Sequence, residues 1–580
     1  MKPRWAIVAV CVGLVGCFGP RARFQSAEEN ENKGPEVRTI GDITFLESQQ
    51  EMSVEGVGLA VHLNGKGGGA PPAGPQREML EKDLLRRGIR KPQTVLESRD
   101  CAMVILRAKI HAGVRKNDPI DIEVSLPDGS RCESLRGGYL VSCELFNYSS
   151  IKELNPNHQG ADRSLKGYPL VKAEGAIITG VTGKVGRAAG ERGASPETYR
   201  NEEESHKAGS VWSGGKCQID PPLLLSLNEG QRSARFSAHV ADRINQTFPG
   251  MNFGRDGLAV ARNQALVALG VPLQYRHNIA HYLRVVRAIP LERNPPMDSP
   301  YRRQLANQLL DPAKCLSAAL RLEALGEDSV PALRAALAAP LPLSRFAAAQ
   351  ALTYLRKRDG VDELARLAVE QPALRGLCLT ALGSLDESIC HVKLADLMSH
   401  QDPTLRYGAF YALRVLDDRA AEVPGEHCKD AYWVHQVATD STPMIHCLTS
   451  RRAEIVLFGK GPSLLPGERL SFGEFTIAAD AGADLCTLKL FSLKEKAMVE
   501  KKCSPAMSEI LKTLAEMGGT YVDAVDLLRK ASVNGRLNCQ LHENALPRVA
   551  DPGLLTRAAK DDPALRTIPA ASATLFDGGQ

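Results

Sequence analysis

The chain has 580 residues, of which 43% are apolar and 24% are charged, so it is long enough for several domains with buried cores. Its 72 basic and 67 acidic residues leave a formal net charge of only +5. This net positive charge is too small to indicate a protein that binds nucleic acid, and we expect no nucleic-acid partner.

The first residues have the pattern of a bacterial export signal. Lys2 and Arg4 flank the start of an apolar run, residues 5–15, which is shorter than the ~20 residues that a membrane span needs. The sequence LVGC, ending at Cys17, resembles the bacterial lipobox, in which the cysteine becomes the lipidated first residue. We predict a lipoprotein-type signal peptide over 1–16, lipidation of Cys17 with a membrane tether, and a polar linker over 17–36. An ordinary signal peptide cleaved nearby is the alternative.

The stretch EGVGLAVHLNGKGGG, residues 55–69, has the glycines of a phosphate-binding loop without its spacing. Ala60 occupies the position of the first P-loop glycine, and Gly67 stands where that loop needs Ser or Thr. A dinucleotide loop fails as well, because Val61 fills the place of its third glycine. We predict a strand with close backbone packing that ends in a flexible glycine-rich loop, and no bound cofactor.

Residues 37–291 mix short strand patterns with amphipathic helices, which is typical of an α+β region. Residues 300–420 are rich in alanine and leucine and lack strand patterns. Prolines recur there at spacings of 30, 30 and 31, namely Pro312, Pro342, Pro372 and Pro403, and arginines follow the last three by three residues, namely Arg345, Arg375 and Arg406. We predict helix pairs, each begun by a proline, that stack like short HEAT-like repeats. A docking surface and a spacer are both open as roles for this block.

Strand patterns return over residues 432–546, followed by two helical segments separated by Gly518 and Gly519. The tail, residues 547–580, is polar with a weak pattern, and we predict that it is poorly ordered. The expected fold class is therefore α+β, with mixed domains interrupted by an all-α block.

The sequence contains 14 cysteines, and twelve remain after the signal peptide and Cys17 are set aside. No Cys-x-x-Cys pair occurs, so a zinc or thioredoxin motif has no support. The segment CESLRGGYLVSC centres on Gly137 and Gly138, a two-residue hairpin signal. Counting outward from this turn pairs Cys132 with Cys143, which makes them a possible disulfide. The count also makes them a hydrogen-bonded pair, which is less suited to a disulfide between strands.

Catalytic patterns are absent from the sequence. The 13 histidines are scattered, and neither His-Glu-x-x-His nor Gly-x-Ser-x-Gly occurs. His277 and His281 would share a helix face, but no third ligand appears at a clear spacing. Asp121 and Glu123 alternate with isoleucines, as residues do on the solvent-exposed face of a strand. We predict no enzyme, no metal and no cofactor.

Several segments, taken in order, resemble the flagellar P-ring protein family of bacterial basal bodies. The similar segments lie at 54–67, 79–89, 102–110, 117–140, 173–180, 223–248, 453–479 and 522–541. The sharpest identity is Ser134–Gly138 (SLRGG). The resemblance covers about 37–291 and 432–546, and the helical block stands between them as an insertion.

This resemblance implies a structural subunit of a periplasmic ring that surrounds the flagellar rod at the peptidoglycan layer. It implies further copies of the chain, rod and L-ring proteins, and peptidoglycan as partners. Lipidation at Cys17, the helical block and the many cysteines depart from the family pattern. The alternative is a non-flagellar envelope lipoprotein whose helical repeats recruit a partner.

Overall fold

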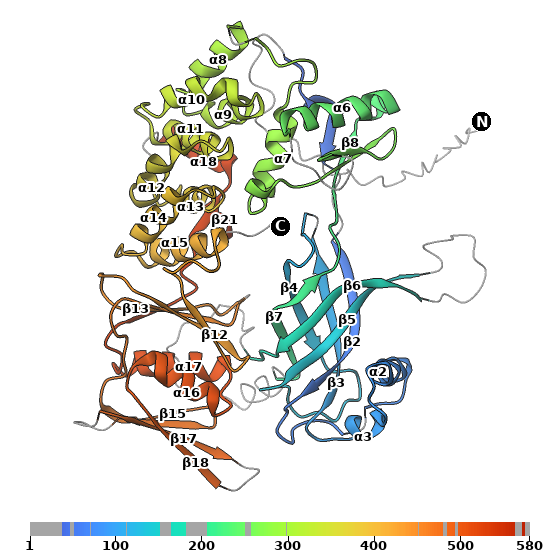
Figure 1. The fold of residues 1–580 in the computed structure, drawn as a ribbon, viewed down its shortest axis with the longest axis vertical. Coiled ribbons are helices and arrows are strands. Elements are labelled where there is room, and N and C mark those ends of the chain that lie inside the picture. The colour runs from blue at the N-terminus through green and yellow to red at the C-terminus, as the bar shows by residue number, and fades with distance from the viewer. Residues whose placement is uncertain are drawn as a thin grey trace, which may run out of the picture.

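We analysed a computed structural model, which describes residues 37–46, 51–69, 71–111, 113–150, 164–180, 206–249, 257–296, 298–450, 452–479, 484–492, 497–562 and 571–574. Figure 1 shows four bodies, which we call the sheet body, the barrel, the helical stack and the C-terminal body. The predicted α+β class is confirmed. The signal peptide, the linker and Cys17 lie outside the described residues.

None of the helices in the described ranges combines the length and the apolar character that crossing a membrane requires.

The sheet body contains the beginning of the described chain and returns to it after the barrel. Its elements are α1 (Ile40–Ile43), β1 (Thr44–Leu46), β8 (Leu223–Leu227), η2 (Glu229–Gln231), α6 (Ala234–Thr247), β9 (Ala259–Ala261), β10 (Leu266–Leu269), η3 (Leu273–Tyr275) and α7 (Ile279–Ala288). The antiparallel sheet has the order β1-β8-β10-β9. The helices bury apolar stripes such as Val240 and Ile244 of α6 against it, as their 3.6-residue spacing predicts.

The barrel is a six-stranded sheet that closes in the order β2-β3-β4-β7-β6-β5. Its elements are β2 (Met52–Val61), α2 (Pro75–Arg86), α3 (Pro92–Leu96), β3 (Ala102–Ile110), β4 (Pro119–Ser125), β5 (Tyr139–Ser150), β6 (Ser164–Ala176) and β7 (Ala208–Cys217). The predicted glycine-rich strand is β2. A Cβ at Gly58 would lie 2.9 Å from Leu140, and one at Gly67 would lie 2.4 Å from the carbonyl oxygen of Arg99. These glycines allow close contact with the protein's own chain, as predicted, and the start of the loop is packed rather than free.

The helical stack arranges its helices in two layers (Figure 1). Its elements are α8 (Pro300–Gln308), α9 (Cys315–Ala324), η4 (Glu327–Ser329), α10 (Val330–Ala336), α11 (Pro342–Tyr354), η5 (Arg358–Gly360), α12 (Val361–Glu370), α13 (Arg375–Leu382), α14 (Ser388–Leu397) and α15 (Pro403–Leu416). Helices α9, α11, α13 and α15 adjoin one another in one layer. Pro342 and Pro403 begin helices, as predicted. Pro312 and Pro372 instead lie in turns before α9 and α13, so the prediction was wrong there.

The C-terminal body places two helices between two sheets (Figure 1). Its elements are β11 (Gly425–Cys428), β12 (Tyr432–Val437), β13 (Met444–Cys447), β14 (Glu454–Phe458), β15 (Gly467–Phe472), β16 (Phe475–Ala479), β17 (Cys486–Ser492), β18 (Ala497–Cys503), α16 (Met507–Glu516), α17 (Tyr521–Val533) and β19 (Gln540–Glu543). The sheet orders are β11-β12-β14-β13-β19 and β15-β16-β17-β18.

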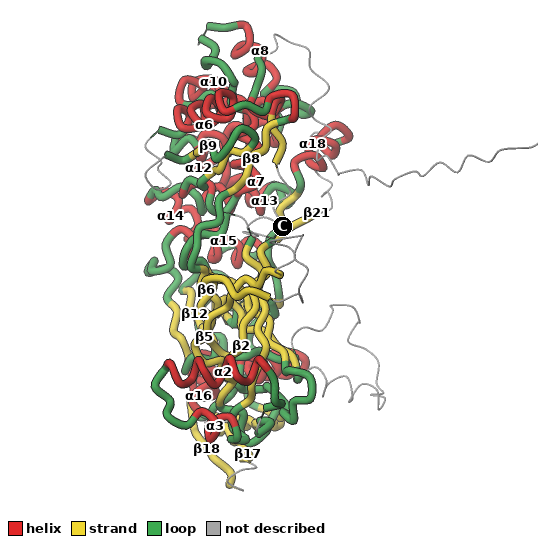
Figure 2. Tube along the Cα trace, turned by 90° about the vertical axis from the view of Figure 1, so that its right-hand side faces the viewer, coloured by secondary structure: helices red, strands yellow, loops and turns green. Residues whose placement is uncertain are grey.

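The tail differs from the prediction of poor order. It contains β20 (Arg548–Ala550), α18 (Pro552–Asp561) and β21 (Ala571–Thr574), which lie along one side of the helical stack (Figure 2). Leu555 and Ala559 are fully buried in the core of the stack, four residues apart on one face of α18. Gly376 of α13 gives the backbone of the tail room, since a Cβ there would lie 2.5 Å from the carbonyl oxygen of Arg548. Residues 547–562 are therefore docked, because this short apolar stripe finds a matching surface.

Candidate functional site: three junctions between the bodies

The first junction joins the sheet body to the helical stack around a buried carboxylate. Glu323 of α9 is only 2% exposed. It accepts hydrogen bonds from the hydroxyl of Tyr275 at 2.7 Å and pairs with Nε2 of His281 at 2.9 Å. Tyr354 of α11 stacks on Tyr275 with ring centroids 4.9 Å apart, and its hydroxyl accepts from the amide of Asn278 at 2.9 Å. A buried carboxylate is costly unless it is paired, so this cluster fixes how the two bodies meet.

The two histidines that the sequence places four residues apart have different surroundings. His281 is engaged by Glu323. Burial, and after it the charge of Arg276, lowers the pKa of His277 to about 4. Among the described residues no group of three or more metal-binding side chains comes together.

The second junction joins α15 to the C-terminal body around another buried carboxylate. Glu454 of β14 is 1% exposed. It accepts from the hydroxyl of Tyr407 at 2.9 Å and from Nη1 of Arg414, both of which are on α15. Tyr407 also stacks on His446 of β13, with ring centroids 3.6 Å apart. Arg406 donates from Nη1 to the carbonyl oxygen of Thr442 at 2.8 Å. The last helix of the stack is thus tied to two strands of the C-terminal body and to the segment before β13.

The recurring arginines have a structural role inside the stack. Each one donates to a carbonyl in, or just after, the last turn of the preceding helix, where backbone acceptors lack intrahelical partners. The bonds join Arg345 Nη1 to Ala339 at 3.2 Å, Arg375 Nε to Ala368 at 3.1 Å and Arg406 Nε to Met398 at 3.1 Å. Arg302 of α8 donates to the carbonyl oxygen of Pro295 at 2.9 Å, but this acceptor lies in the segment before α8 and not at the end of a helix. The arginine pattern therefore marks helix capping and not a ligand site.

The third junction joins the barrel to the C-terminal body. Arg136, within the SLRGG segment, donates from Nη2 to Oδ1 of Asp523 at 2.6 Å. Asp523 is buried and forms a capping box with Thr520 at the start of α17. Trp212 of β7 packs edge-on against Tyr521, with centroids 6.0 Å apart. The sequence marks Arg136 as part of the sharpest identity, but only the fold shows its partner, which lies 387 residues away along the chain.

The predicted hairpin around Gly137 and Gly138 is wrong. Residues 131–136 form no strand, and β5 pairs with β2 and β6 instead. Cys132 and Cys143 are both buried and free, with Sγ contacts to the carbonyl oxygens of Lys66 and Ala173 respectively. Because the segment before Gly137 is irregular, the strand register from which this disulfide was inferred does not exist.

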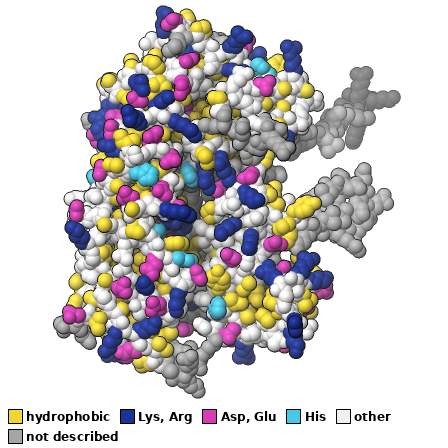
Figure 3. Space-filling view, in the orientation of Figure 1, with side chains coloured by type: hydrophobic (Ala, Val, Ile, Leu, Met, Phe, Trp, Pro, Cys, Tyr) yellow, Lys and Arg dark blue, Asp and Glu magenta, His cyan; other side chains and the backbone are white. Residues whose placement is uncertain are grey.

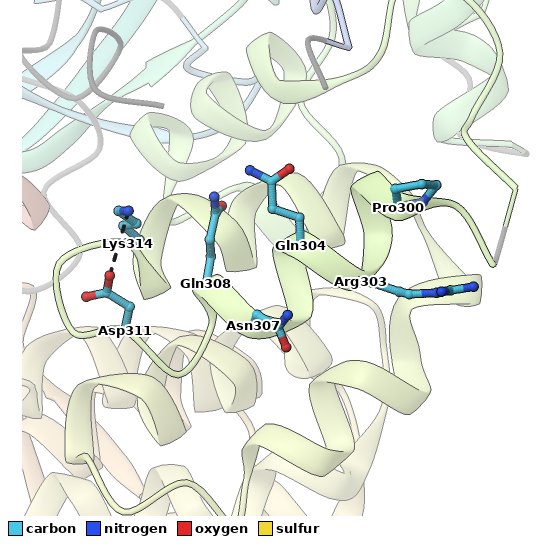
Figure 4. Close-up of a pocket in the computed structure, with 7 residues that line it drawn as sticks. All are labelled: Pro300, Arg303, Gln304, Asn307, Gln308, Asp311 and Lys314. Atoms are coloured by element: carbon cyan, nitrogen blue, oxygen red, sulfur yellow. Dashed lines mark ion pairs between the residues drawn. The ribbon is translucent and has the colours of Figure 1, made fainter. Parts of the chain in front are cut away.

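A surface hollow of about 440 Å³ lies on α8 and the turn after it (Figure 4). Its lining is polar and includes the pair Asp311 and Lys314, 3.9 Å apart. Charges of both signs are interspersed over the face in Figure 3. We attach no binding function to this hollow.

His446 makes the second junction sensitive to acid. Burial, followed by the charge of His542, lowers the pKa of His446 to about 3. A base whose folded pKa is depressed stays neutral in the folded chain while the unfolded chain takes up a proton. The contribution of neutral His446 to the stability of the fold is therefore complete above about pH 6.5 and is lost as the pH falls towards 3. Between pH 7 and pH 5 we expect this residue to remove about 2 kcal/mol of unfolding free energy.

Urea unfolding at the two pH values measures this loss. The variant His446→Phe keeps an aromatic ring on Tyr407. Its unfolding free energy should depend less on pH, because close to one proton fewer is taken up on unfolding. An unchanged pH dependence in the variant would assign the acid sensitivity to other groups.

Comparison with known proteins follows the division into bodies. Residues 39–298 match the family model described as flagellar P-ring protein. This range covers the sheet body and the barrel and ends just before α8. The predicted resemblance is confirmed there, whereas for residues 432–546 it stays a prediction.

Curated relatives carry the same name. The flagellar P-ring protein of Gluconobacter oxydans is 29% identical over 218 residues, which are 36% of this chain and 50% of that protein. That of Caulobacter vibrioides is 27% identical over 242 residues, 40% of this chain and 55% of that protein. The chain thus spans about half the length of these relatives. Through its sheet body and barrel, residues 39–298, the chain is similar to the flagellar P-ring protein family.

Proposed function

We propose that the chain is a structural subunit of a flagellar P ring, a periplasmic ring around the rod of the basal body. The observation that carries this proposal is the extent of the family match. It includes the whole sheet body and the whole barrel, each with its own core, and stops at residue 298. The similarity therefore extends over both bodies rather than over part of one.

The helical stack is part of the rigid subunit in this proposal. Buried polar contacts hold it to the sheet body at Glu323 and to the C-terminal body at Glu454. In a ring built by repeating one head-to-tail interface, such a stack would appear once per subunit as a collar. Other copies of the chain, rod and L-ring proteins and peptidoglycan are the partners that this function requires. Lipidation of Cys17, with a membrane tether, belongs to the same proposal.

The proposed role is structural and not catalytic. The buried polar side chains at the three junctions are used in holding elements together, and the family description names a ring protein.

Mass spectrometry of basal bodies purified from the native bacterium tests the function. We expect the chain to co-purify with rod and hook proteins, and its N-terminal peptide to carry lipid on Cys17. Deleting the gene should abolish swimming in soft agar, and a plasmid copy should restore it. If the chain is absent from basal bodies and the deletion strain swims normally, the ring function is wrong. The non-flagellar envelope scaffold would then be the function to test.

A further inference from the structure

Two cysteines of the C-terminal body face each other across a pair of strands. In the antiparallel ladder of β17 and β18, Cys486 is the direct partner of Cys503. Directly opposed residues project to the same face of a sheet. Cys486 is 0% exposed and Cys503 is 8% exposed, and both belong to the core of this body. Among the strand pairings in the described part of the chain, this is the register position that two cysteines share.

The backbone geometry suits a covalent link. Opposed Cα atoms in antiparallel strands are about 4.5 or 5.5 Å apart, depending on whether the pair is hydrogen-bonded. Disulfides span Cα separations of about 4.4 to 6.8 Å. Either kind of pair therefore lies within reach without moving the strands. Cys132 and Cys143 lack this arrangement, because residues 131–136 form no strand.

We propose that Cys486 and Cys503 form an intrachain disulfide that closes the β17–β18 hairpin. Both cysteines have free thiols in the structure. The proposal rests on the proposed function for its setting, since disulfides persist in oxidising compartments such as the periplasm.

The oxidant is a disulfide, either of a thiol oxidoreductase or of oxidised glutathione. One protein thiolate attacks a sulfur of the oxidant, forms a mixed disulfide and releases one thiol. The second protein thiolate then attacks the sulfur of the first cysteine and releases the second thiol. The two cysteines lose two electrons and two protons in total, and the oxidant becomes two thiols.

Burial determines when this bond forms. It raises the pKa of Cys486 to about 11 and also raises the pKa of Cys503. Thiolates are the attacking species, so the folded and reduced pair reacts slowly at neutral pH. We expect the bond to form during folding, before the hairpin packs against α16.

The link would hold an edge of the molecule in register. β18 is the outer strand of its sheet, and Met498 and Val499 on it are exposed. A free edge strand is prone to slip and to pair with other chains. A bond between Cys486 and Cys503 fixes β18 to β17 at the end where the hairpin joins the body.

Peptide mapping of the full-length chain tests the proposal. The chain is unfolded in reductant, refolded in a mixture of reduced and oxidised glutathione, alkylated and digested with trypsin without reduction. Cleavage at Arg469, Lys489, Lys502 and Lys512 gives peptides 470–489 and 503–512, with one cysteine each. We expect these two peptides to be recovered linked and to separate after reduction. Recovery of both as alkylated single peptides, or linked to other cysteines, would overturn the proposal.

Stability measurements provide a matched control. Reductant should lower the urea midpoint of the refolded wild-type chain but not that of Cys486→Ser or Cys503→Ser. Cys378→Ser, which alters another fully buried thiol, should keep the wild-type response to reductant. A reductant effect that persists in Cys486→Ser would contradict the assignment. Because the refolding needs no basal body, its result is independent of the proposed function, which the purification of basal bodies decides separately.

Discussion

Replacing Glu454 by glutamine is expected to lower the free energy of unfolding by about 3–5 kcal/mol. The carboxylate is buried and pairs with Arg414, whose side chain is itself mostly buried. Glutamine can still accept from Tyr407, but it leaves the guanidinium of Arg414 without a compensating charge. Loss of one partner of a buried pair is more costly than loss of both, because an uncompensated charge stays in the interior. Urea unfolding of the full-length chain measures the change.

A double-mutant cycle with Arg414→Gln separates the pair from its surroundings. The double variant should lose less stability than the sum of the two single variants. The exposed pair of Glu516 and Lys501, 2.9 Å apart, supplies the control. Glu516→Gln should change stability by no more than about 0.5 kcal/mol. A loss below about 1 kcal/mol in Glu454→Gln would mean that the second junction does not depend on this charge.

Gly376→Val is expected to displace the tail from the helical stack at a cost of about 1–3 kcal/mol. The new Cβ would meet the carbonyl oxygen of Arg548 at 2.5 Å, and a backbone atom cannot turn aside as a side chain can. Helix propensity acts in the other direction, because valine is the better helix former. Destabilisation would therefore report the clash. Limited trypsin digestion should cut the variant at Arg557 and Lys560 faster than the wild type.

Two controls accompany this variant. Ala335→Val places the same side chain on an exposed position of α10 and should leave the digestion pattern unchanged. In a chain that ends at residue 546, Gly376→Val should cost nothing further, because the atoms it would meet are gone. Equal digestion of the wild-type chain and Gly376→Val would show that the tail tolerates the larger side chain.

Local patterns in the sequence predicted the elements, and long-range contacts determined the site. The glycine-rich strand β2, the two helices of the C-terminal body and the alternation of Asp121 and Glu123 follow from periods of 2 and 3.6 residues. The partners of Glu323 and Arg136 do not. Tyr275 lies 48 residues from Glu323, and Asp523 lies 387 residues from Arg136. No local pattern encodes such pairs, since they exist only once the bodies have docked.

The wrong predictions of the hairpin and of the tail have a common cause. The hairpin at Gly137 follows the local turn signal, but β5 has stronger competitors for its edges in β2 and β6. The tail has a weak pattern of its own, with only Leu555 and Ala559 fully buried on α18. It is ordered because the stack presents Gly376, which lets the backbone at Arg548 approach closely, and Gly408, which leaves room for the ring of Pro547. In both cases tertiary contacts overrode the local signal.

The three junctions, together with the chain itself, connect the four bodies in a closed loop of contacts. The sheet body leads into the stack, the stack leads into the C-terminal body, and Arg136 brings that body back onto the barrel. The stack is therefore a spacer, and its length must match the gap between the sheet body and the C-terminal body. Adding or removing one 30-residue unit would separate Arg136 from Asp523 or open one of the other two junctions. Unlike an open solenoid, which can lengthen one repeat at a time, this stack has its repeat number fixed by the distance between the bodies it connects.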